Sequence, residues 1–178
     1  MAEPTVPPRA KLFIGVLTAR EDLLLMTEER LVRRYGAIDF RTRKLPFSHT
    51  DYYDSIGRNL FKVLYSFERL IPREDIVTVK LATNRLEKKI TARTREKDAP
   101  RRINIDPGYL TLSNVYLASC KEFFHRTYLW RGVYLENEYR YVGRRFQPWE
   151  WTYPDYRKME YLDFFHQVRA IYRKQIEN

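Results

Sequence analysis

Lys11–Leu17, with the sequence KLFIGVL, is a short apolar run that predicts a buried β-strand. Directly after it, Thr18 and Glu21 have the Thr-x-x-Glu spacing of a capping box, which predicts the start of a helix. Gly36 is expected to end that helix. The buried face of this helix is expected to carry Leu24, Leu31 and Tyr35.

Further strands and a second helix continue this pattern. Pro72 is expected as the first residue of the second helix, which runs to about Thr91. The strands around it are expected at Ala37–Leu45, Asn59–Phe67 and Arg102–Asp106. The order β-α-β-β-α-β is that of a ferredoxin-like core, in which both helices cover one face of the sheet.

The C-terminal part of the chain predicts additions to this core. Three more antiparallel strands are expected, the last two joined near Arg131-Gly132: Asn114–Cys120, Thr127–Trp130 and Val133–Tyr141. A closing helix is expected at about Pro154–Ile176, with a buried stripe of Tyr161, Phe165, Val168 and Tyr172. We therefore predict a single α+β domain over residues 11–178, preceded by a flexible tail over residues 1–10. A different antiparallel α+β sheet is the alternative.

Composition limits the class of protein. Hydrophobic residues make up 44% of the 178 residues and aromatic residues 15%, which is enough for a core and argues against disorder. No apolar run approaches the length that spans a bilayer, and Met1–Arg9 lacks the features of a signal peptide. Cys120 is the one cysteine, so no internal disulfide forms. These features predict a cytoplasmic protein that makes no membrane contact.

The formal net charge is +10, and arginine supplies most of the positive charge. A field of this sign attracts anions, and arginine binds phosphate in a bidentate way. Arg85–Arg102 alone has eight basic and three acidic residues, a net charge of +5. This segment is either a solvated loop or a contact for a nucleic-acid backbone.

From Phe47 onward, a set of spaced motifs is similar to one known family. The motifs are Thr50-x-Tyr52-Tyr53, Ser66-Phe67-Glu68, Lys80-x-x-Thr83-Asn84-x-x-Glu87, Asn104-Ile105-Asp106-Pro107-Gly108-Tyr109, Leu117-Ala118-x-x-Lys121, His125-Arg126, Gly132-Val133-Tyr134-x-Glu136 and Trp151-Thr152-Tyr153-Pro154-Asp155-Tyr156. They resemble an uncharacterised prokaryotic family, the domain of unknown function 4416, over about residues 11–175.

The resemblance brings no known activity, cofactor or catalytic residue with it. The first of these motifs also includes Gly57, and the chain departs from the family pattern at Ser55-Ile56, where a Glu-Met pair is expected before that glycine. Some relatives are labelled as GTP-binding, but none of the six glycines is followed by lysine. A Walker-type phosphate loop is therefore absent, and the identity of any cofactor stays unknown.

The predicted strand Arg102–Asp106 alternates polar and apolar residues. Two isoleucines are expected on one face, while Arg102, Asn104 and Asp106 lie on the other. Pro107-Gly108 is expected to turn the chain sharply after them. The polar face either orients a ligand or faces water.

A second candidate site follows the next strand. Lys121, His125 and Arg126 are cationic or nearly so, and they suit a phosphate if one helical turn brings them together. The alternative is a basic hairpin connection with no ligand, which Phe123 and Phe124 fix against the core. Glu136 is expected to pair with Lys121 or Arg126, as an ordinary ion pair more readily than as a general base.

A third candidate is a polar stripe on the second predicted helix. It consists of Lys80, Asn84 and Glu87, at spacings of four and three residues. The stripe either borders a cleft or forms salt bridges within the helix.

These candidates support two main hypotheses and leave open whether the protein is an enzyme. The first is binding of a small phosphorylated ligand or nucleotide, with phosphate at Lys121, His125 and Arg126. The second is RNA binding through Arg85–Arg102 and the aromatic-basic run Tyr139–Trp151. The less favoured hypotheses are a structural adaptor and a two-histidine phosphoesterase, which would pair His125-Arg126-Thr127 with His49-Thr50. No histidine or carboxylate spacing supports a metal site.

Overall fold

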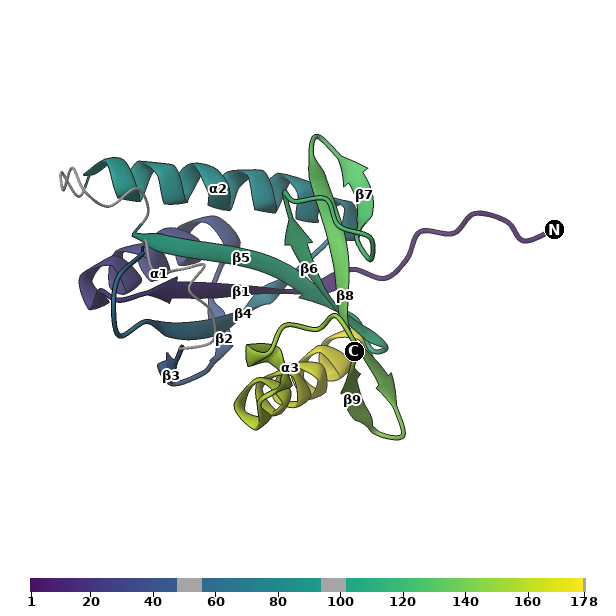
Figure 1. Ribbon diagram of the computed structural model, residues 1–178. Helices are drawn as coiled ribbons and strands as arrows, with labels where there is room; N and C mark the ends of the chain where they lie inside the picture. Colours follow the sequence, from purple (N-terminus) through teal and green to yellow (C-terminus); the bar gives the residue numbers. More distant parts are fainter. Residues whose placement is uncertain (48–55, 94–101, 178) are drawn as a thin grey trace.

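The computed structural model describes residues 1–47, 56–93 and 102–177 (Figure 1). The protein is a mixed α+β structure with one large antiparallel sheet and three helices, one of them C-terminal. The strands are β1 (Ala10–Thr18), β2 (Ile38–Arg41), β3 (Leu45–Pro46), β4 (Phe61–Ile71), β5 (Ile103–Leu110), β6 (Asn114–Ser119), β7 (Thr127–Trp130), β8 (Val133–Val142) and β9 (Arg145–Pro148). The helices are α1 (Glu21–Tyr35), α2 (Ile76–Arg93) and α3 (Met159–Glu177).

Apart from the two-residue strand β3, which pairs with β4, the elements from β1 to β5 follow the predicted order β-α-β-β-α-β. Their strands lie in the order β2-β4-β1-β5, with all neighbours antiparallel. The predicted stripe of α1 is buried, and it packs with α2 on the side of the sheet that carries Ile103 and Ile105. One face of the sheet therefore carries both helices, as expected for this order of elements.

The C-terminal elements extend the sheet and cover its other face. The sheet continues from β5 through β6 and β8 to β7 at the edge, and β9 pairs with the far end of β8. Helix α3 packs below this face with the predicted stripe buried, against Phe13 and Leu64 (Figure 1). No helix in the described ranges has the length and apolar character needed to cross a membrane.

The predicted capping box is wrong. Helix α1 begins after Arg20, which makes no side-chain capping bond, and Thr18 belongs to β1. The Thr18 hydroxyl accepts a hydrogen bond from the Arg20 amide and donates one to the Arg102 carbonyl. The spacing was right for a cap, but the apolar strand extends one residue further than expected and takes Thr18 into the sheet.

The predicted turn at Pro107-Gly108 is also wrong, since β5 runs straight through to Leu110. The amide of Ile105 points away from β1 and donates to Glu87, so the Pro107 nitrogen, two positions on, faces the same side. No described strand pairs with that edge of β5 before Gly108, so the missing N–H of proline removes no hydrogen bond to a described strand. A Cβ on Gly108 would lie 2.2 Å from the Tyr116 carbonyl oxygen, which explains glycine inside a strand.

Two tight turns shape the end of the sheet. Arg131 and Gly132 both have positive φ and join β7 to β8, as predicted. Gly143 and Arg144 repeat this conformation and join β8 to β9, a hairpin that the sequence analysis missed. Residues with positive φ at both central positions match the twist of a two-residue hairpin.

Candidate functional site

The loop between β6 and β7 brings two of the predicted residues onto one carboxylate of β8. Glu136 accepts a hydrogen bond from Arg126 Nε at 2.7 Å and lies 2.9 Å from His125 Nε2. The three side chains are at most 7% exposed. The predicted ion pair between Arg126 and Glu136 forms, and it is buried rather than exposed.

The other donors of Arg126 are also engaged. Its Nη1 donates to the carbonyl of Lys121 at 3.0 Å, and its Nη2 donates to the hydroxyl of Tyr153 at 2.7 Å. A guanidinium held at three nitrogens has a fixed position. Arg126 therefore ties together the loop, strand β8 and the segment after β9.

The loop itself differs from expectation in two ways. Residues 121–126 form bends and a turn, closed by a hydrogen bond from the Arg126 amide to the Phe123 carbonyl, and no helical turn forms. Phe123 is 55% exposed and Phe124 is 82% exposed, so these rings do not anchor the loop in the core. Ion pairing and ring stacking hold the loop instead.

A stack of flat side chains supports His125 from behind. The ring of Trp151 is stacked nearly parallel to that of His125, with centroids 5.1 Å apart, and nearly parallel to that of Trp149, with centroids 5.2 Å apart. Arg140 lies over the outer face of Trp149, with 4.6 Å from its Cζ to the ring centroid. The predicted aromatic-basic run is thus partly a stack and partly core, because Tyr139 and Phe146 are buried.

These residues line a pocket of about 550 Å³, called here the β6–β7 pocket. Its lining consists of Lys121, Glu122, Phe123, Phe124, His125, Arg126, Glu136, Glu150, Trp151 and Tyr153. All three residues predicted to bind phosphate therefore lie around one hollow, together with three carboxylates.

A second carboxylate of β8 lies deeper. Glu138 is fully buried, and neither of its oxygens has a hydrogen-bond partner within the described residues. Burial, followed by the negative charges of Glu136 and Asp155, raises the pKa of Glu138 well above its ordinary value. The backbone of Tyr153 lies close enough to oppose this shift without completing a hydrogen bond. Glu138 therefore favours its protonated form.

The predicted polar face of β5 meets the predicted polar stripe of α2. Lys80 donates to Asp106 at 3.1 Å, and Asn104 donates to the other oxygen of the same carboxylate. Burial opposes ionisation of Asp106, but Lys80, Lys62 and Asn104 together lower its pKa below the ordinary value. Asp106 is thus held as a carboxylate.

The other two residues of the α2 stripe also form hydrogen bonds with residues outside the helix. Among the described strands, β6 is the one that pairs with the edge of β5 facing away from β1, and it does so only from Gly108 onward. Glu87 accepts from the Ile105 amide on that edge at 2.6 Å, and Asn84 donates to Cys120 at 3.2 Å. The stripe therefore bridges the opening between the two strands. Arg102 lies just before β5, where its carbonyl accepts the bond from Thr18.

Tyr153 lies between the two clusters. Burial, followed by the charge of Glu136, raises the pKa of Tyr153 to about 12, and Asp106 adds to the shift while Arg126 opposes it. Asp106 of β5 and Arg126 of the β6–β7 loop therefore both affect the pKa of Tyr153. The sequence analysis missed Tyr153 as a connecting residue, although it named the Trp-Thr-Tyr-Pro motif that contains it.

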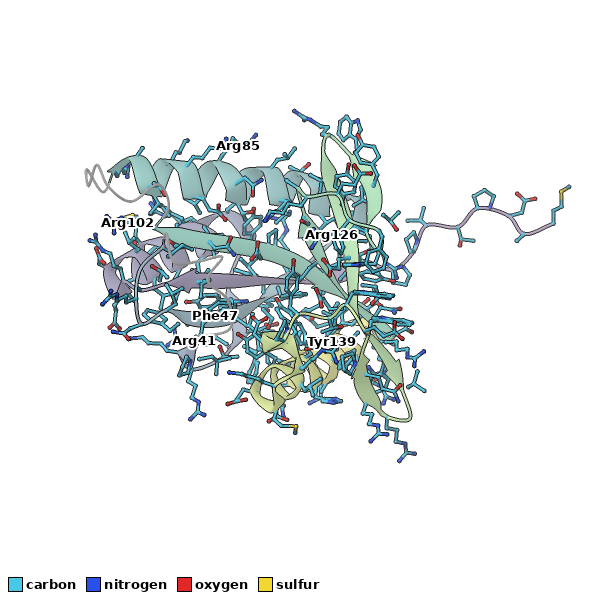
Figure 2. The ribbon with its side chains drawn as sticks, in the orientation of Figure 1. Arg41, Phe47, Arg85, Arg102, Arg126 and Tyr139 are labelled. Atoms are coloured by element: carbon cyan, nitrogen blue, oxygen red, sulfur yellow. The ribbon has the colours of Figure 1, made fainter. Side chains whose placement is uncertain are left out.

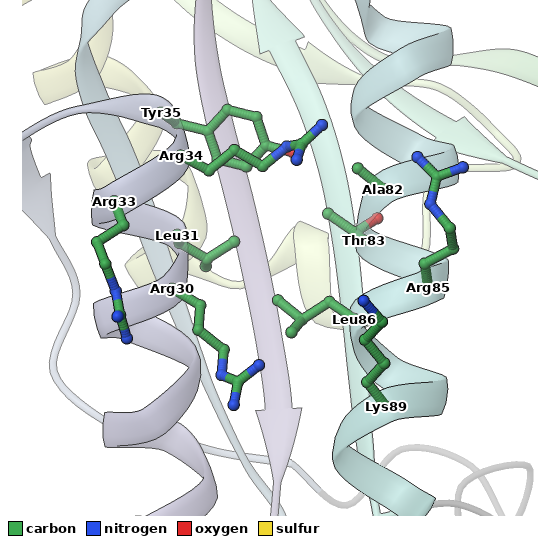
Figure 3. A pocket seen from close by; sticks show the side chains of 10 residues that line it. All are labelled: Arg30, Leu31, Arg33, Arg34, Tyr35, Ala82, Thr83, Arg85, Leu86 and Lys89. Atoms are coloured by element: carbon green, nitrogen blue, oxygen red, sulfur yellow. The ribbon is translucent and has the colours of Figure 1, made fainter.

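A third site, not predicted as a unit, lies between α1 and α2 on the opposite side of the sheet from α3. It is a groove of about 600 Å³, called here the cationic groove, and its walls carry Arg30, Arg33, Arg34, Arg85 and Lys89. Its floor is formed by Leu31, Tyr35, Ala82, Thr83 and Leu86. Figure 3 shows Arg30 and Arg34 extending from α1 toward α2.

Most of the positive charge of this groove has no carboxylate partner among the described residues. None of the described residues that line it has a carboxylate, and Arg33 alone among its five cations has an ion-pair partner in the described part of the chain, Glu29 at 3.7 Å. The Nε of Arg30 is buried and has no hydrogen-bond partner there. The sequence analysis found the α2 side, within Arg85–Arg102, but not the α1 side.

Some predicted features cannot be placed. His49-Thr50, residues 94–101 and the Ser55-Ile56 departure fall wholly or partly outside the described residues. Within the described ranges, no group of three or more histidine, cysteine, aspartate or glutamate side chains is arranged to hold a metal ion.

Comparisons with known proteins identify the family alone. No curated protein matches the chain, and neither does any solved structure. The ferredoxin-like classification therefore rests on the order of elements and stays a prediction. A family model described as domain of unknown function (DUF4416) matches residues 8–172, almost the whole chain. The chain belongs to this family.

Proposed function

We propose that the protein binds single-stranded RNA through the cationic groove. The observation that carries this proposal is the convergence of five cations from two helices distant in sequence, with no carboxylate among the described residues that line the groove. Phosphates are the anions that arginine and lysine bind along a nucleic-acid backbone.

The arrangement favours a chain of phosphates over one small anion. A site for a small ligand usually holds its donors rigidly, whereas four of these five cations have no ion-pair partner in the described ranges. Helix α2 has 18 residues, so its axis is about 27 Å long at 1.5 Å per residue. Lys88 and Arg93 extend the basic character along the same helix. The net charge of +10 supports the same partner.

The competing hypothesis is a small phosphorylated ligand or nucleotide at Lys121, His125 and Arg126. In the β6–β7 pocket, a phosphate would compete with Glu136 for Arg126, because that guanidinium is already bonded at 2.7 Å. The hypothesis stays a prediction, and cytoplasmic RNA is the partner that we favour.

Fluorescence anisotropy of a labelled single-stranded RNA, measured over a series of salt concentrations, tests the proposal. We expect affinity to fall steeply with salt, with a log-log slope of roughly −0.7 for each phosphate neutralised. The variant Arg30→Gln/Arg34→Gln/Arg85→Gln should bind at least tenfold more weakly, and its slope should be smaller by about 2.

A variant of matched charge provides the control. Arg131, Arg144 and Arg145 lie at or beside the two hairpin turns and are not part of the groove lining, and replacing all three with Gln removes the same net charge. Binding that is salt-insensitive, or lost equally in both variants, would contradict the proposal. So would a nucleoside monophosphate that displaces the RNA from the wild type but not from Lys121→Ala.

A further inference from the structure

The β6–β7 pocket has aromatic walls that no part of the proposed function uses. The ring of Phe124 is perpendicular to those of His125 and Trp151, at 4.8 and 6.4 Å. Trp151 is stacked with both His125 and Trp149 and is only partly exposed, whereas Phe124 is 82% exposed. Phe124 is therefore the most exposed aromatic ring among the described residues of the lining, and it offers the largest ring surface to a ligand.

The charge around these rings is the reverse of that in the cationic groove. Arg126 and Glu136 form a buried pair and cancel each other. The other charged residues of the lining are two carboxylates, Glu122 and Glu150, and one ammonium, Lys121. Outside the pair, the lining is therefore net negative. Aromatic faces together with carboxylates attract organic cations.

One buried polar atom in the pocket wall lacks a partner. Because the Glu136 carboxylate only accepts, the hydrogen bond to it places a proton on Nε2 of His125, and in the neutral ring Nδ1 is then an acceptor. This Nδ1 atom is buried and has no hydrogen-bond partner within the described residues, on a side chain that is 6% exposed. A donor from a ligand would satisfy it once the side chains that cover this atom move aside.

We propose that the β6–β7 pocket binds a protonated alkylamine. Its alkyl groups would lie against the face of Phe124, its charge would be balanced by Glu122 and Glu150, and its N–H would donate to His125 Nδ1. This site is independent of RNA binding in the cationic groove, which lies on different elements.

Three probes of nearly equal size separate the contributions of the positive charge, the N–H group and apolar contact to binding. They are N,N-dimethylethanolamine, which is a cation with an N–H at neutral pH, choline, a cation without an N–H, and 3,3-dimethyl-1-butanol, the neutral isostere of choline. Each is titrated against the full chain and followed by tryptophan fluorescence, because Trp151 lines the pocket. We expect affinity to fall in that order.

Two variants test the named contacts. Phe124→Leu keeps apolar bulk at an exposed position, and we expect it to weaken binding of choline roughly threefold to tenfold. Glu150→Gln should weaken both cations and leave the butanol unchanged. Tyr128→Leu is the matched control, because Tyr128 is a 56% exposed ring outside the pocket lining.

The inference is overturned by equal binding of choline and the neutral isostere, since that would indicate plain apolar contact. It is also overturned if no probe binds, if Phe124→Leu and Tyr128→Leu behave alike, or if inorganic phosphate binds the pocket and competes with the amines. Loss of RNA binding in the groove variant leaves these results unaffected, so the two proposals fail separately.

Discussion

Positive charge is paired and buried in the β6–β7 pocket, whereas in the cationic groove it has few partners among the described residues. Arg126 in the pocket is 7% exposed and bonded at three nitrogens, whereas the groove gathers five cations around an apolar floor without a carboxylate among its described lining residues. Arg85 and Arg126 mark these two regions in Figure 2. A buried charge requires a partner within the protein, while an exposed one is stabilised by water and stays available to a ligand.

Replacing Glu136, the carboxylate of the buried ion pair, should have the largest effect on stability. Glu136→Gln leaves Arg126 buried without a countercharge, and we expect a loss of about 3–5 kcal/mol in the free energy of unfolding. Urea denaturation of the two proteins measures it. Glu122→Gln removes a carboxylate from the same lining outside the buried pair, and it should cost less than about 0.5 kcal/mol. Equal effects of both substitutions would show that burial does not distinguish the two carboxylates.

The second prediction concerns Glu138 and depends on pH. Since its pKa is raised in the folded protein, the fold retains a proton that the unfolded chain loses above the ordinary value of 4.5. Stability from this group is therefore full below that value and falls as pH rises toward the folded pKa. Glu138→Gln should be more stable than wild type by about 1–3 kcal/mol at pH 8, with the difference disappearing near pH 4.

Thermal unfolding across that pH range provides the measurement. A constant difference between Glu138→Gln and wild type would contradict the titration, because a pH-independent effect would come from packing alone. Glu122→Gln again serves as the exposed control.

The smallest effect on stability is expected in the groove. Arg30→Gln, Arg34→Gln and Arg85→Gln should each change the free energy of unfolding by no more than about 0.5 kcal/mol, since no ion pair in the described residues is broken. Relief of repulsion between like charges could even raise stability slightly. A large loss in any of these variants, measured by urea denaturation, would mean that the groove arginines are structural.

Local patterns predicted much of the fold. The apolar run of β1, the stripe of α3 and the hairpin turn at Arg131-Gly132 were all identified, because each depends on neighbours within a few residues. The predicted capping box and the Pro107-Gly108 turn failed, since each motif has more than one structural use. Thr18 caps nothing once the strand includes it, and proline is tolerated in β5 because its nitrogen faces an edge where no described strand pairs.

The candidate site was predicted less completely. The pairing of Arg126 with Glu136 and the polar face of Asn104 and Asp106 were expected from alternation and charge. The bond from Arg126 to Tyr153 was not, because the two residues are 27 positions apart and belong to different elements. The exposure of Phe124 was also missed, since an aromatic residue usually indicates a core.

The sequence by itself determined the α+β class, the family, the strong positive charge and the face on which each side chain lies within its own element. The tertiary structure alone decided which faces meet: that α1 and α2 place their cations around one groove, and that β8 places a carboxylate beneath a cationic loop. The physical reason is that periodicity is a local property of the backbone, whereas the charge environment of a side chain depends on strands and helices brought together by burial of the core.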